Sequence, residues 1–586
     1  MSKYNIICQY HPAAALHQPY LWASMLDDWV HLPEKVDASY TVNTCPSSLP
    51  KLFSLDTEND AAGKLGAWSI AYRDEERKLC VCPFEYAKPN FIVPDDCRVI
   101  YHNAKWDTRV LRNNNMLVPK NFVDTMIAAY TLGHGKQDPK DTGKSGDRMV
   151  GGLGLKYLGR RHLGMQMKSW NDVKDHPAEM LEYNAADSVA TYLLWEKWEK
   201  DLPQHFWAID MLLLPVLMKM EDRGILVDSN FLQEYAKTLD ERLKEIDLKG
   251  INPYSPDQVA DYVYNKLGYQ VTKKTETGKP STDKEVLESI DDPIVQGILE
   301  YREVYKERKT YVGAYAERMS TDGRIHCEFK QVSTVTGRLS SANPNLQNVT
   351  KGSLRKLFIP SPGKLLVVLD WQQIELRVFA TLVQEQKMLD ALHAGRSIHQ
   401  ETADVLNIPY DDGKVINFLM LYGGGAWKIS QEFHVPIDDA HSMLSRYYKA
   451  YPGIKIYHER QREIARTERQ VTTWSGRTRR LDGMYSEDKR TIHDAENLAI
   501  NLPVQGTAGE IVKLAMIDLD KKDAPMLLSV HDELLFEVET SRARDYGYWL
   551  KEYVPTITEI NGEKFPVDVG TERNWFEAKE KENLLK

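Results

Sequence analysis

The sequence predicts a large, multidomain protein of mixed α/β and α+β class. Its 586 residues correspond to about three or four domains of ordinary size. The apolar run at residues 365–369 indicates a buried strand. Helical spacing follows this run, with apolar residues at Ile374, Val378 and Leu382. Residues 526–538 hold two short apolar runs around an acidic centre, which predicts a β-hairpin.

The overall composition excludes several classes of protein. At 42% hydrophobic and 27% charged, the chain is typical of a soluble globular protein. No stretch approaches the roughly 20 apolar residues of a membrane span, and the first residues lack the pattern of a secretion signal. The six cysteines form no paired C-x-x-C pattern, which argues against structural zinc and for a reducing compartment. We therefore expect a cytoplasmic protein without membrane contact.

The net charge of −10 is a poor guide to any one face of the protein. Local basic clusters occur at residues 351–356, at residues 477–480, and at Lys273 with Lys274. These clusters are candidates for contacts to nucleic-acid phosphates. The alternative for each cluster is a solvated run of surface charge.

Acidic residues stand at both strand ends in the second half of the chain. Asp370 closes the first strand, and Asp532 and Glu533 lie at the tip of the hairpin. Taken alone, Asp370 would be interpreted as the cap of the helix that follows. Carboxylates that converge from distant segments repel one another, however, so they usually hold cations. Two divalent metals roughly 3.5–4 Å apart are the recurrent arrangement for phosphoryl transfer.

Three further pairs of polar residues follow apolar segments in the first third of the chain. Each pair shares one face, because its members are two apart in a strand or four apart in a helix. Any one pair is also consistent with helix capping or a solvated surface. The three pairs are Asp56 and Glu58, Asn103 and Asp107, and Tyr183 and Asp187.

In chain order these pairs form the patterns D-x-E, N-x-x-x-D and Y-x-x-x-D, which resemble the three motifs of the DnaQ-like 3′-to-5′ exonucleases. All three motifs are complete. Two cations at such a site lower the pKa of a bound water and offset charge on the leaving oxygen. The resemblance implies that Tyr183 orients this water. The metal ligands that it implies are Asp56, Glu58, Asp107 and Asp187.

Two other runs closely match family A (Pol I-like) DNA polymerases. They are STVTGRLSS at residues 333–341 and NPNLQN at residues 343–348. With residues 364–382, the resemblance covers nearly all of the chain from about residue 50 onwards. It implies an RNase H-like 3′-5′ exonuclease domain followed by a right-hand polymerase domain of palm, fingers and thumb.

The resemblance divides the chain into four expected parts. Residues 1–50 have no clear role. The other parts are the exonuclease domain at 51–200, the connector and thumb at 201–330, and the palm and fingers at 331–586, with the fingers at about 385–480.

The palm of such an enzyme holds two Mg²⁺, and the exonuclease site two more, with Mn²⁺ as an expected substitute. The resemblance places Glu375 at the steric gate against a ribose 2′-hydroxyl and Gln373 at the nucleotide. Trp371 contributes only its backbone carbonyl to the metal. The residues assigned to the catalytic and metal site are Asp370, Trp371, Asp532 and Glu533.

Lys414, Phe418 and Tyr422 are spaced four apart and share one helical face. The glycines at residues 423–425 end that helix and permit a hinge. On an arbitrary helix such a row would be ordinary packing. Its resemblance to the O helix of the fingers implies that the lysine faces the triphosphate, Phe418 the base or sugar, and Tyr422 the templating pair. Phe418 also implies discrimination against nucleotides that lack a 3′-hydroxyl.

The chain departs from the family where the fingers meet the triphosphate. The family has an arginine one turn before the lysine, and this chain has Tyr410. Triphosphate binding is therefore expected to depend on Lys414, His399 and Arg396. Which of these groups replaces the arginine stays open.

Four residues match family positions that touch the primer-template. Minor-groove acceptors look nearly alike for every correct pair, so fixed donors can test geometry without reading sequence. Asn497 stands where bacterial relatives have arginine. The four matching residues are Arg338, Asn501, Gln505 and His531.

The predicted function is template-directed DNA synthesis from dNTPs with 3′-5′ proofreading in DNA replication, as a phage replicase. The expected partners are primer-template DNA and dNTPs, for a monomer beside a helicase or single-strand-binding protein. The alternatives are a repair nuclease or DNA-binding protein with a degenerate polymerase half, and a single-subunit RNA polymerase. The last alternative does not account for Glu375 or for the exonuclease motifs.

Overall fold

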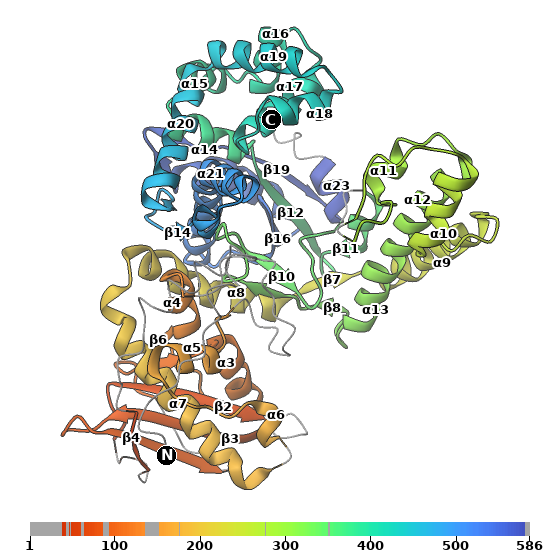
Figure 1. Ribbon diagram of the computed structural model, residues 1–586. Coiled ribbons are helices and arrows are strands. Elements are labelled where there is room, and N and C mark those ends of the chain that lie inside the picture. The colour runs from red at the N-terminus through yellow and green to blue at the C-terminus, as the bar shows by residue number, and fades with distance from the viewer. Residues whose placement is uncertain are drawn as a thin grey trace.

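The computed structural model describes residues 38–42, 46, 48–59, 64–85, 93–134, 152–174, 176–275, 277–349 and 352–580. Most of the segment at 1–50, including residues 1–37, lies outside these residues. Figure 1 shows a smaller lobe built from the start of the chain below a larger one. One lobe holds a sheet with parallel strands and the other an antiparallel sheet, which confirms the predicted mixed α/β and α+β class. No helix in the described ranges has the length and apolar character to cross a membrane.

The smaller lobe, here called the N-terminal domain, is a six-stranded sheet with helices packed on it. The strand order is β1-β4-β3-β2-β5-β6, in which β2 pairs parallel to β5 and antiparallel to β3. Helix α7 covers one face of β2, where the Ser54 hydroxyl donates to the carbonyl of Ser188 at 2.6 Å. By alternation, Phe53 and Leu55 point to the opposite face of the strand, where they are buried in the core. The strands are β1 (Thr41–Val42), β2 (Leu52–Asn59), β3 (Leu65–Arg73), β4 (Leu79–Glu85), β5 (Arg98–Tyr101) and β6 (Phe122–Asp124). The helices are α3 (Ala104–Asn113), α4 (Thr125–Thr131), α5 (Leu155–Leu163), α6 (Trp170–Val173) and α7 (Pro177–Trp198).

The palm is a four-stranded antiparallel sheet of order β15-β16-β12-β19. The predicted strand is the central β12, where Leu366 to Leu369 are fully buried. The predicted hairpin is β15 and β16, closed by the two-residue turn His531-Asp532. Both predictions are confirmed. The strands are β12 (Lys364–Trp371), β15 (Met526–Val530), β16 (Glu533–Glu539) and β19 (Val567–Glu572); the palm helices are α14 (Ile374–Val383), α21 (Lys489–Asp520), α22 (Ala543–Tyr553) and α23 (Trp575–Glu580).

The fingers stand above the palm in Figure 1 and are mostly helical. Asn417 ties three of these helices together, because its Oδ1 accepts hydrogen bonds from the hydroxyls of Thr402 at 3.1 Å and Tyr447 at 3.0 Å. The helices of the fingers are α15 (Gln386–His393), α16 (Ile398–Leu406), α17 (Tyr410–Leu421), α18 (Ala426–Phe433), α19 (Ile437–Ala450) and α20 (Pro452–Glu468). The hairpin of β13 (Gln470–Thr472) and β14 (Thr478–Arg480) follows and lies lower, beside the palm (Figure 1).

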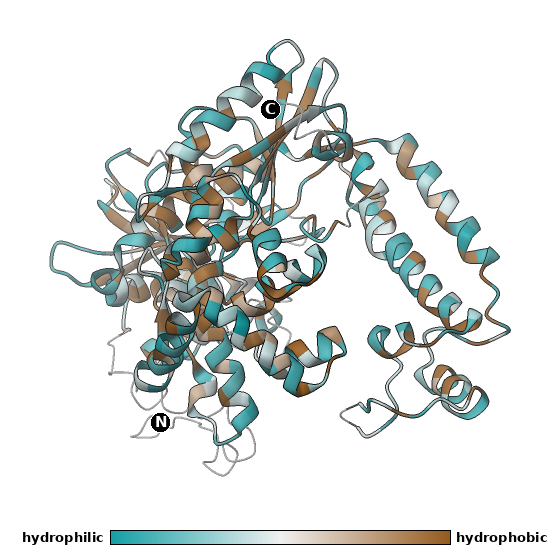
Figure 2. Cartoon of the chain, turned by 90° about the horizontal axis from the view of Figure 1, so that it is seen from above, coloured by the Kyte–Doolittle hydropathy of each residue, from teal (hydrophilic) through white to brown (hydrophobic). Residues whose placement is uncertain are grey.

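The thumb projects from the larger lobe as a group of helices with a small core of its own (Figure 2). Its loop carries Lys273, whose ammonium lies 2.9 Å from Asp283 and also contacts Glu285. Lys273 is therefore paired within the thumb in this structure, in contrast to the phosphate contact that the sequence suggested. The thumb helices are α9 (Ser229–Glu245), α10 (Pro256–Ala260), α11 (Lys284–Glu288), α12 (Pro293–Lys306) and α13 (Ala314–Arg318), with π-helices η4 (Asp261–Lys266) and η5 (Glu307–Gly313).

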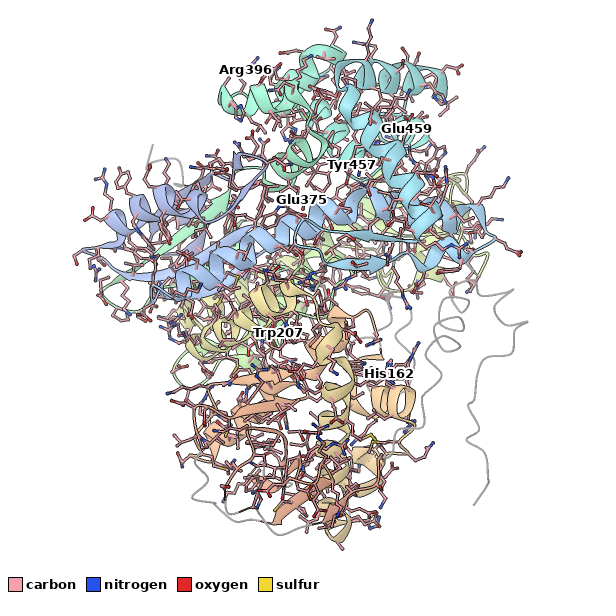
Figure 3. The ribbon with its side chains drawn as sticks, turned by 90° about the vertical axis from the view of Figure 1, so that its left-hand side faces the viewer. His162, Trp207, Glu375, Arg396, Tyr457 and Glu459 are labelled. Atoms are coloured by element: carbon pink, nitrogen blue, oxygen red, sulfur yellow. The ribbon has the colours of Figure 1, made fainter. Side chains whose placement is uncertain are left out.

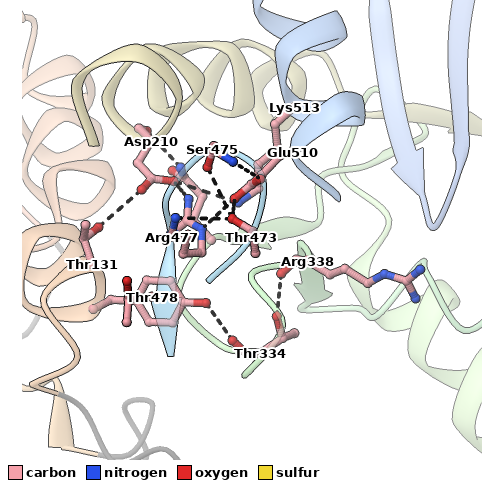
Figure 4. Close-up of polar contacts among 12 residues, drawn as sticks. Thr131, Asp210, Thr334, Arg338, Thr473, Ser475, Arg477, Thr478, Glu510 and Lys513 are labelled. Atoms are coloured by element: carbon pink, nitrogen blue, oxygen red, sulfur yellow. Dashed lines mark hydrogen bonds and ion pairs between the residues drawn. The ribbon is translucent and has the colours of Figure 1, made fainter. Parts of the chain in front are cut away.

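A buried ionic cluster joins the N-terminal domain, the connector and the palm (Figure 4). Arg477 donates a hydrogen bond of 2.7 Å to Asp210, the last residue of the π-helix η3 (Phe206–Asp210). The Nε of Arg477 lies 3.4 Å from Glu510 of α21. Lys513 lies 3.9 Å from Asp210. Arg477 and Arg479 are almost completely buried, so the interpretation of these two arginines as phosphate contacts was wrong. The acidic partners of Arg477 are remote in sequence, and Arg479 donates to the backbone carbonyls of Tyr130 and Val335, so the sequence hid both arrangements.

Substituting Asp210 tests how much this cluster stabilises the fold. Asp210→Ala leaves Arg477 and Lys513 buried beside each other with one acid fewer, so we expect the free energy of unfolding to fall by about 3–5 kcal/mol. The measurement is the midpoint of urea unfolding. Asp201→Ala, at an exposed aspartate of the same connector, is the control and should change the midpoint little. Equal midpoints for the two variants would contradict the prediction.

Candidate functional site

The first acidic cluster lies on β2 and α7 of the N-terminal domain. Asp56 and Glu58 alternate with the buried Thr57, so their side chains leave the strand on the same side. Helix α7 brings Asp187 to them, and carboxylate oxygens of the three residues all lie within 4.8 Å of one another. Such a set of hard oxygen donors suits a divalent cation.

Two other motif residues lie beside this cluster. Asp107 of α3 accepts hydrogen bonds from the backbone N–H and the hydroxyl of Thr57, at 2.9 and 2.8 Å. Its Oδ1 is thus turned to the strand, and its pKa is raised by burial. The Tyr183 hydroxyl interacts with the carboxylates of Glu58 and Asp187. The structure therefore brings five of the six motif residues into one region, all except Asn103.

Lys156 is a residue of this site that the sequence reasoning missed. It lies on α5, its ammonium contacts the Asp187 carboxylate, and it stands 3.9 Å from the centre of the Tyr183 ring. Asn184 was also missed, and its Nδ2 donates to Asp56 at 2.6 Å. The position of Asn184, one residue after Tyr183, was a usable signal, whereas nothing in the spacing of Lys156 pointed to the site.

Burial and mutual repulsion change the acidity of these groups. Burial, with the nearby Asp187, raises the pKa of Glu58 to about 8. Burial raises the pKa of Asp187 to about 6, although Lys156 acts in the opposite direction. Burial, followed by the neighbouring carboxylates, also raises the pKa of Asp56. The folded domain therefore holds protons that the unfolded chain releases.

These shifts predict a pH-dependent stability in metal-free buffer. The folded-state pKa values of Glu58 and Asp187 lie above the unfolded values, so the free energy of unfolding should fall as pH rises from about 5 to 8. The melting temperature should fall by about 2–4 °C per kcal/mol lost. Added Mg²⁺ binds the ionised carboxylates of the folded state and should reverse the fall. Calorimetry with chelator or Mg²⁺ measures both effects.

The control is the double variant Asp56→Asn with Glu58→Gln. This variant should lose most of the stabilisation of the domain by Mg²⁺, and its free energy of unfolding should depend less steeply on pH. Equal stabilisation of this variant and the natural chain by Mg²⁺ would show that the metal binds elsewhere.

The second acidic cluster lies where β12 meets the β15–β16 hairpin. Asp370 pairs with Glu533 in the strand register, and the backbone N–H of Trp371 donates to the carbonyl of Asp532 at 3.1 Å. His531 adopts φ of +55° in the turn that presents Asp532. Burial, then the nearby Asp532, raises the pKa of Asp370 to about 7. Its Oδ1 is buried without a hydrogen-bond partner among the described residues, which leaves an oxygen for a cation.

The third acid of this cluster, Glu533, is held by basic residues. Arg355 lies 3.1 Å from the Glu533 carboxylate, and both side chains are buried. Lys579 of α23 contacts Asp370 and lies 3.2 Å from Glu533. Arg355 belongs to the basic cluster at 351–356, so for this arginine the interpretation as a phosphate contact was wrong. No sequence signal linked Lys579 to the acids.

Glu375, on the first turn of α14, is surrounded by polar groups from three other segments. Arg338 forms an ion pair with it. The Tyr422 hydroxyl lies 3.5 Å from its Oε2, and Gln505 of α21 donates to that hydroxyl at 3.1 Å. Figure 3 shows Glu375 where the palm meets the fingers. The proposed sugar gate therefore has a fixed position in this structure.

A cleft of about 390 Å³ opens beside Asp370, between palm and fingers. Two arginines line it. Arg377 donates to the carbonyl of Gln372 at 2.9 Å, whereas Arg396 is more than half exposed and pairs with Glu401. The other predicted residues that line this cleft are Trp371 and Gln373.

The face of α17 carries the predicted row of side chains. Lys414 and Tyr422 are exposed and Phe418 is half-buried. Gly423 follows the helix at φ of +71°, where a Cβ would lie 2.9 Å from Asn497 Oδ1. Only glycine fits there, and the predicted end of the helix is confirmed.

His399 is buried behind this face. Its ring centroid lies 6.0 Å from that of Tyr410 and 5.9 Å from that of Phe418, and Asn417 Nδ2 lies 3.2 Å from its Nδ1. Burial, followed by the charge of Lys414, lowers the pKa of His399 to about 4. The imidazole is thus neutral near pH 7 and offers a hydrogen bond rather than a charge.

The predicted DNA-contacting residues lie around the second acidic cluster. Arg338, His531 and Asp532 line one small niche. Asn501 and Gln505 lie one turn apart on α21, and Asn501 Oδ1 has no hydrogen-bond partner in the described part of the chain. Arg338 and His531 thus lie beside Asp532, and Gln505 reaches the Tyr422 hydroxyl.

Comparison with known families decides what these two clusters belong to. Residues 227–577, more than half of the chain, match the model of the family described as DNA polymerase family A. The chain belongs to this family. Residues 35–203 match the family described as 3′-5′ exonuclease. The expected order, an exonuclease domain followed by a family A polymerase domain, is confirmed.

Individual relatives agree with this placement. The chain is 32% identical over 536 residues to DNA polymerase I of Pseudomonas aeruginosa, which covers 84% of this chain and 58% of that protein. It is 33% identical over 488 residues to the thermostable DNA polymerase I of Thermus aquaticus, covering 78% and 55%. The chain thus spans little more than half the length of these relatives.

A solved structure supports the fold. The POL domain of Pol1 from M. smegmatis, in complex with DNA primer-template and dNTP, superposes with a TM-score of 0.79 at 24% identity. The match covers 92% of this family A chain and all of that one. Polymerase and exonuclease domains of these families generally depend on metal ions, and the acidic cluster of Asp56, Glu58 and Asp187 has a donor set that fits one.

Proposed function

We propose that the chain extends a DNA primer on a template and edits the new 3′ end with its own exonuclease. The observation that carries this proposal is the presence of two separate carboxylate clusters on one chain, each within a matching family region. Selection by fit alone often falls short of the roughly 10⁴–10⁵ discrimination that replication needs, and an editing site supplies the rest.

In the polymerase site, Asp370 and Asp532 would hold two Mg²⁺, with Mn²⁺ as a substitute, and Trp371 would add its backbone carbonyl. Bound there, the ions supply activation of the primer 3′-hydroxyl and neutralisation of phosphate charge. Glu375 would exclude a ribose 2′-hydroxyl, and Gln373 would line the nucleotide site. Because Glu533 is paired with Arg355, we assign it to orienting the strand end rather than to ligation.

In the fingers, Lys414 would neutralise the triphosphate, Phe418 would pack on the base or sugar, and Tyr422 would lie beside the templating pair. His399, being neutral, would donate one hydrogen bond to a phosphate oxygen. Primer-template contacts would come from Arg338, Asn501, Gln505 and His531.

In the exonuclease site, Asp56, Glu58 and Asp187 would hold two further Mg²⁺, with Asp107 as the fourth ligand after turning from Thr57. Tyr183 would orient the attacking water through its hydroxyl, which already interacts with Glu58. Lys156 would offset the charge of Asp187 before the ions bind.

We place this activity in DNA replication, in the cytoplasm, or the host cytoplasm for a phage enzyme. The chain would act as a monomer on primer-template DNA, with a helicase or single-strand-binding protein as replisome partners.

Primer extension with deoxy- and ribonucleotides tests the proposal. Extension with dNTPs and Mg²⁺, followed by removal of a mismatched primer end, is expected. Degradation without extension would favour a repair nuclease, and preferred use of ribonucleotides would favour an RNA polymerase.

Two substitutions should separate the activities. Asp56→Ala with Glu58→Ala should lower primer degradation by at least about 10³-fold and spare extension, because the exonuclease metals lose two ligands. Asp532→Ala should do the reverse. Gel assays of both reactions on one primer-template measure the effects, and loss of both activities in either variant would contradict two independent sites.

Arg396 is our assignment for the cation that replaces the arginine absent at Tyr410. It lines the cleft beside Asp370 and is exposed, whereas His399 is neutral and Arg377 is bonded to the backbone. Arg396→Ala should raise the KM for dNTPs about tenfold with a smaller change in kcat, the effect of one charged contact to phosphate.

The matched control is Arg446→Ala, since Arg446 also lies in the fingers but bonds the carbonyl of Val405 away from this cleft. Adding Tyr410→Arg to Arg396→Ala should lower the KM again. An unchanged KM for Arg396→Ala would remove this arginine from the triphosphate site.

A further inference from the structure

The loop at residues 331–339 connects β9 (Glu328–Lys330) and β10 (Ser340–Ala342) and carries Arg338 to the polymerase site. Its other end touches the N-terminal domain. The Tyr130 hydroxyl, on helix α4, donates to the carbonyl of Thr334 at 2.7 Å. One loop is therefore in contact with both candidate catalytic domains.

Arg479 of β14 strengthens this junction. Its guanidinium lies 4.1 Å from the centre of the Tyr130 ring and donates to the Tyr130 carbonyl at 3.2 Å. Its Nε donates to the carbonyl of Val335 at 3.1 Å. Tyr130 and Arg479 are both buried, so these contacts are shielded from water and have few alternatives.

Within the loop, a second hydrogen bond continues toward the palm. Thr334 Oγ1 donates to the carbonyl of Arg338 at 2.8 Å, as Figure 4 shows. Arg338 pairs with Glu375, the proposed sugar gate. A short chain of contacts thus runs from Tyr130 to the gate, through Thr334 and Arg338.

The surrounding packing limits where the loop can lie. Gly337 has φ of +80°, and a Cβ there would lie 3.2 Å from Arg477 Cδ. A Cβ at Gly506 would lie 3.1 Å from the carbonyl of Thr336. Gln331 donates to the carbonyl of Asp210 at 2.9 Å. The loop is therefore held on several sides. From the N-terminal domain, Tyr130 supplies a hydrogen bond, and Val332 of the loop is buried in the hydrophobic core of that domain.

We propose that Tyr130, a residue of the exonuclease region, is a positioning residue for sugar selection in the polymerase site. By holding the carbonyl of Thr334, it sets the place of Arg338 and so of the Glu375 carboxylate. Exclusion of a 2′-hydroxyl depends on that place, because a side chain that shifts leaves room for the extra oxygen. This inference rests on the proposed polymerase function.

The test is Tyr130→Phe, which removes one hydroxyl and keeps the ring against Arg479. We measure kcat/KM for dCTP and for rCTP on one primer-template. The ratio of dCTP to rCTP should fall about two- to tenfold, the value of one neutral hydrogen bond. The kcat for dCTP and the degradation of single-stranded DNA should stay unchanged.

Two further variants distinguish positioning from general loosening. Tyr192→Phe, in the same domain and similarly buried but bonded to Arg73, should leave the ratio unchanged. Thr334→Ala removes the next bond of the chain and should reproduce the fall. In the double variant Tyr130→Phe with Thr334→Ala, the ratio of dCTP to rCTP should fall by less than the product of the two single fold-changes, because both substitutions break the same chain of contacts.

An unchanged ratio in Tyr130→Phe overturns the inference, as does an equal fall in Tyr192→Phe or a fully multiplicative double variant. Failure of the proposed function is distinct from these results, because the natural chain would then not extend the primer with dCTP at all.

Discussion

Repulsion among buried carboxylates is the constraint on which the rest of this structure depends. Burial and neighbouring acids raise the pKa of Glu58 to about 8 and of Asp370 to about 7, so the acids are costly to keep together without cations. In each set, the fold anchors part of the acids on a strand between two hydrogen-bonded neighbours, Asp56 and Glu58 on β2 and Asp370 on β12. A lysine from a separate helix, Lys156 or Lys579, offsets part of the charge. The same carboxylate oxygens are suitable ligands for divalent cations, whose binding would offset the repulsion.

The junction between the domains uses charge differently. Arg477 is paired with both Asp210 and Glu510, and all three are buried, so each charge is compensated within the protein and loss of one partner would leave a buried charge unpaired. Around this cluster the loop at residues 331–339 meets the N-terminal domain on one side and Glu375 on the other. The geometry of one catalytic region is therefore not independent of the domain that carries the other.

The fingers place an aromatic side chain and a buried histidine together near the cleft. Tyr410, where the sequence resemblance predicts an arginine, packs its ring edge-on to His399, which is buried and neutral. The cationic groups left at the cleft are the guanidiniums of Arg396 and Arg377, with Lys414 exposed on the face of α17. Tyr410 thus adds an aromatic contact to the buried histidine and no positive charge to the cleft.

The sequence by itself determined the strand that ends at Asp370, the β15–β16 hairpin, and the shared faces of Asp56 with Glu58 and of Lys414 with Phe418 and Tyr422. These features follow from backbone periods of 2 and 3.6 residues, which any chain segment expresses locally. Only the tertiary structure decided that Lys579 meets Asp370, 209 residues away, and that Arg477 meets Asp210, 267 residues away. The local sequence around a lysine or arginine does not show whether its side chain is solvated or buried. The acid that neutralises it depends on how distant elements pack.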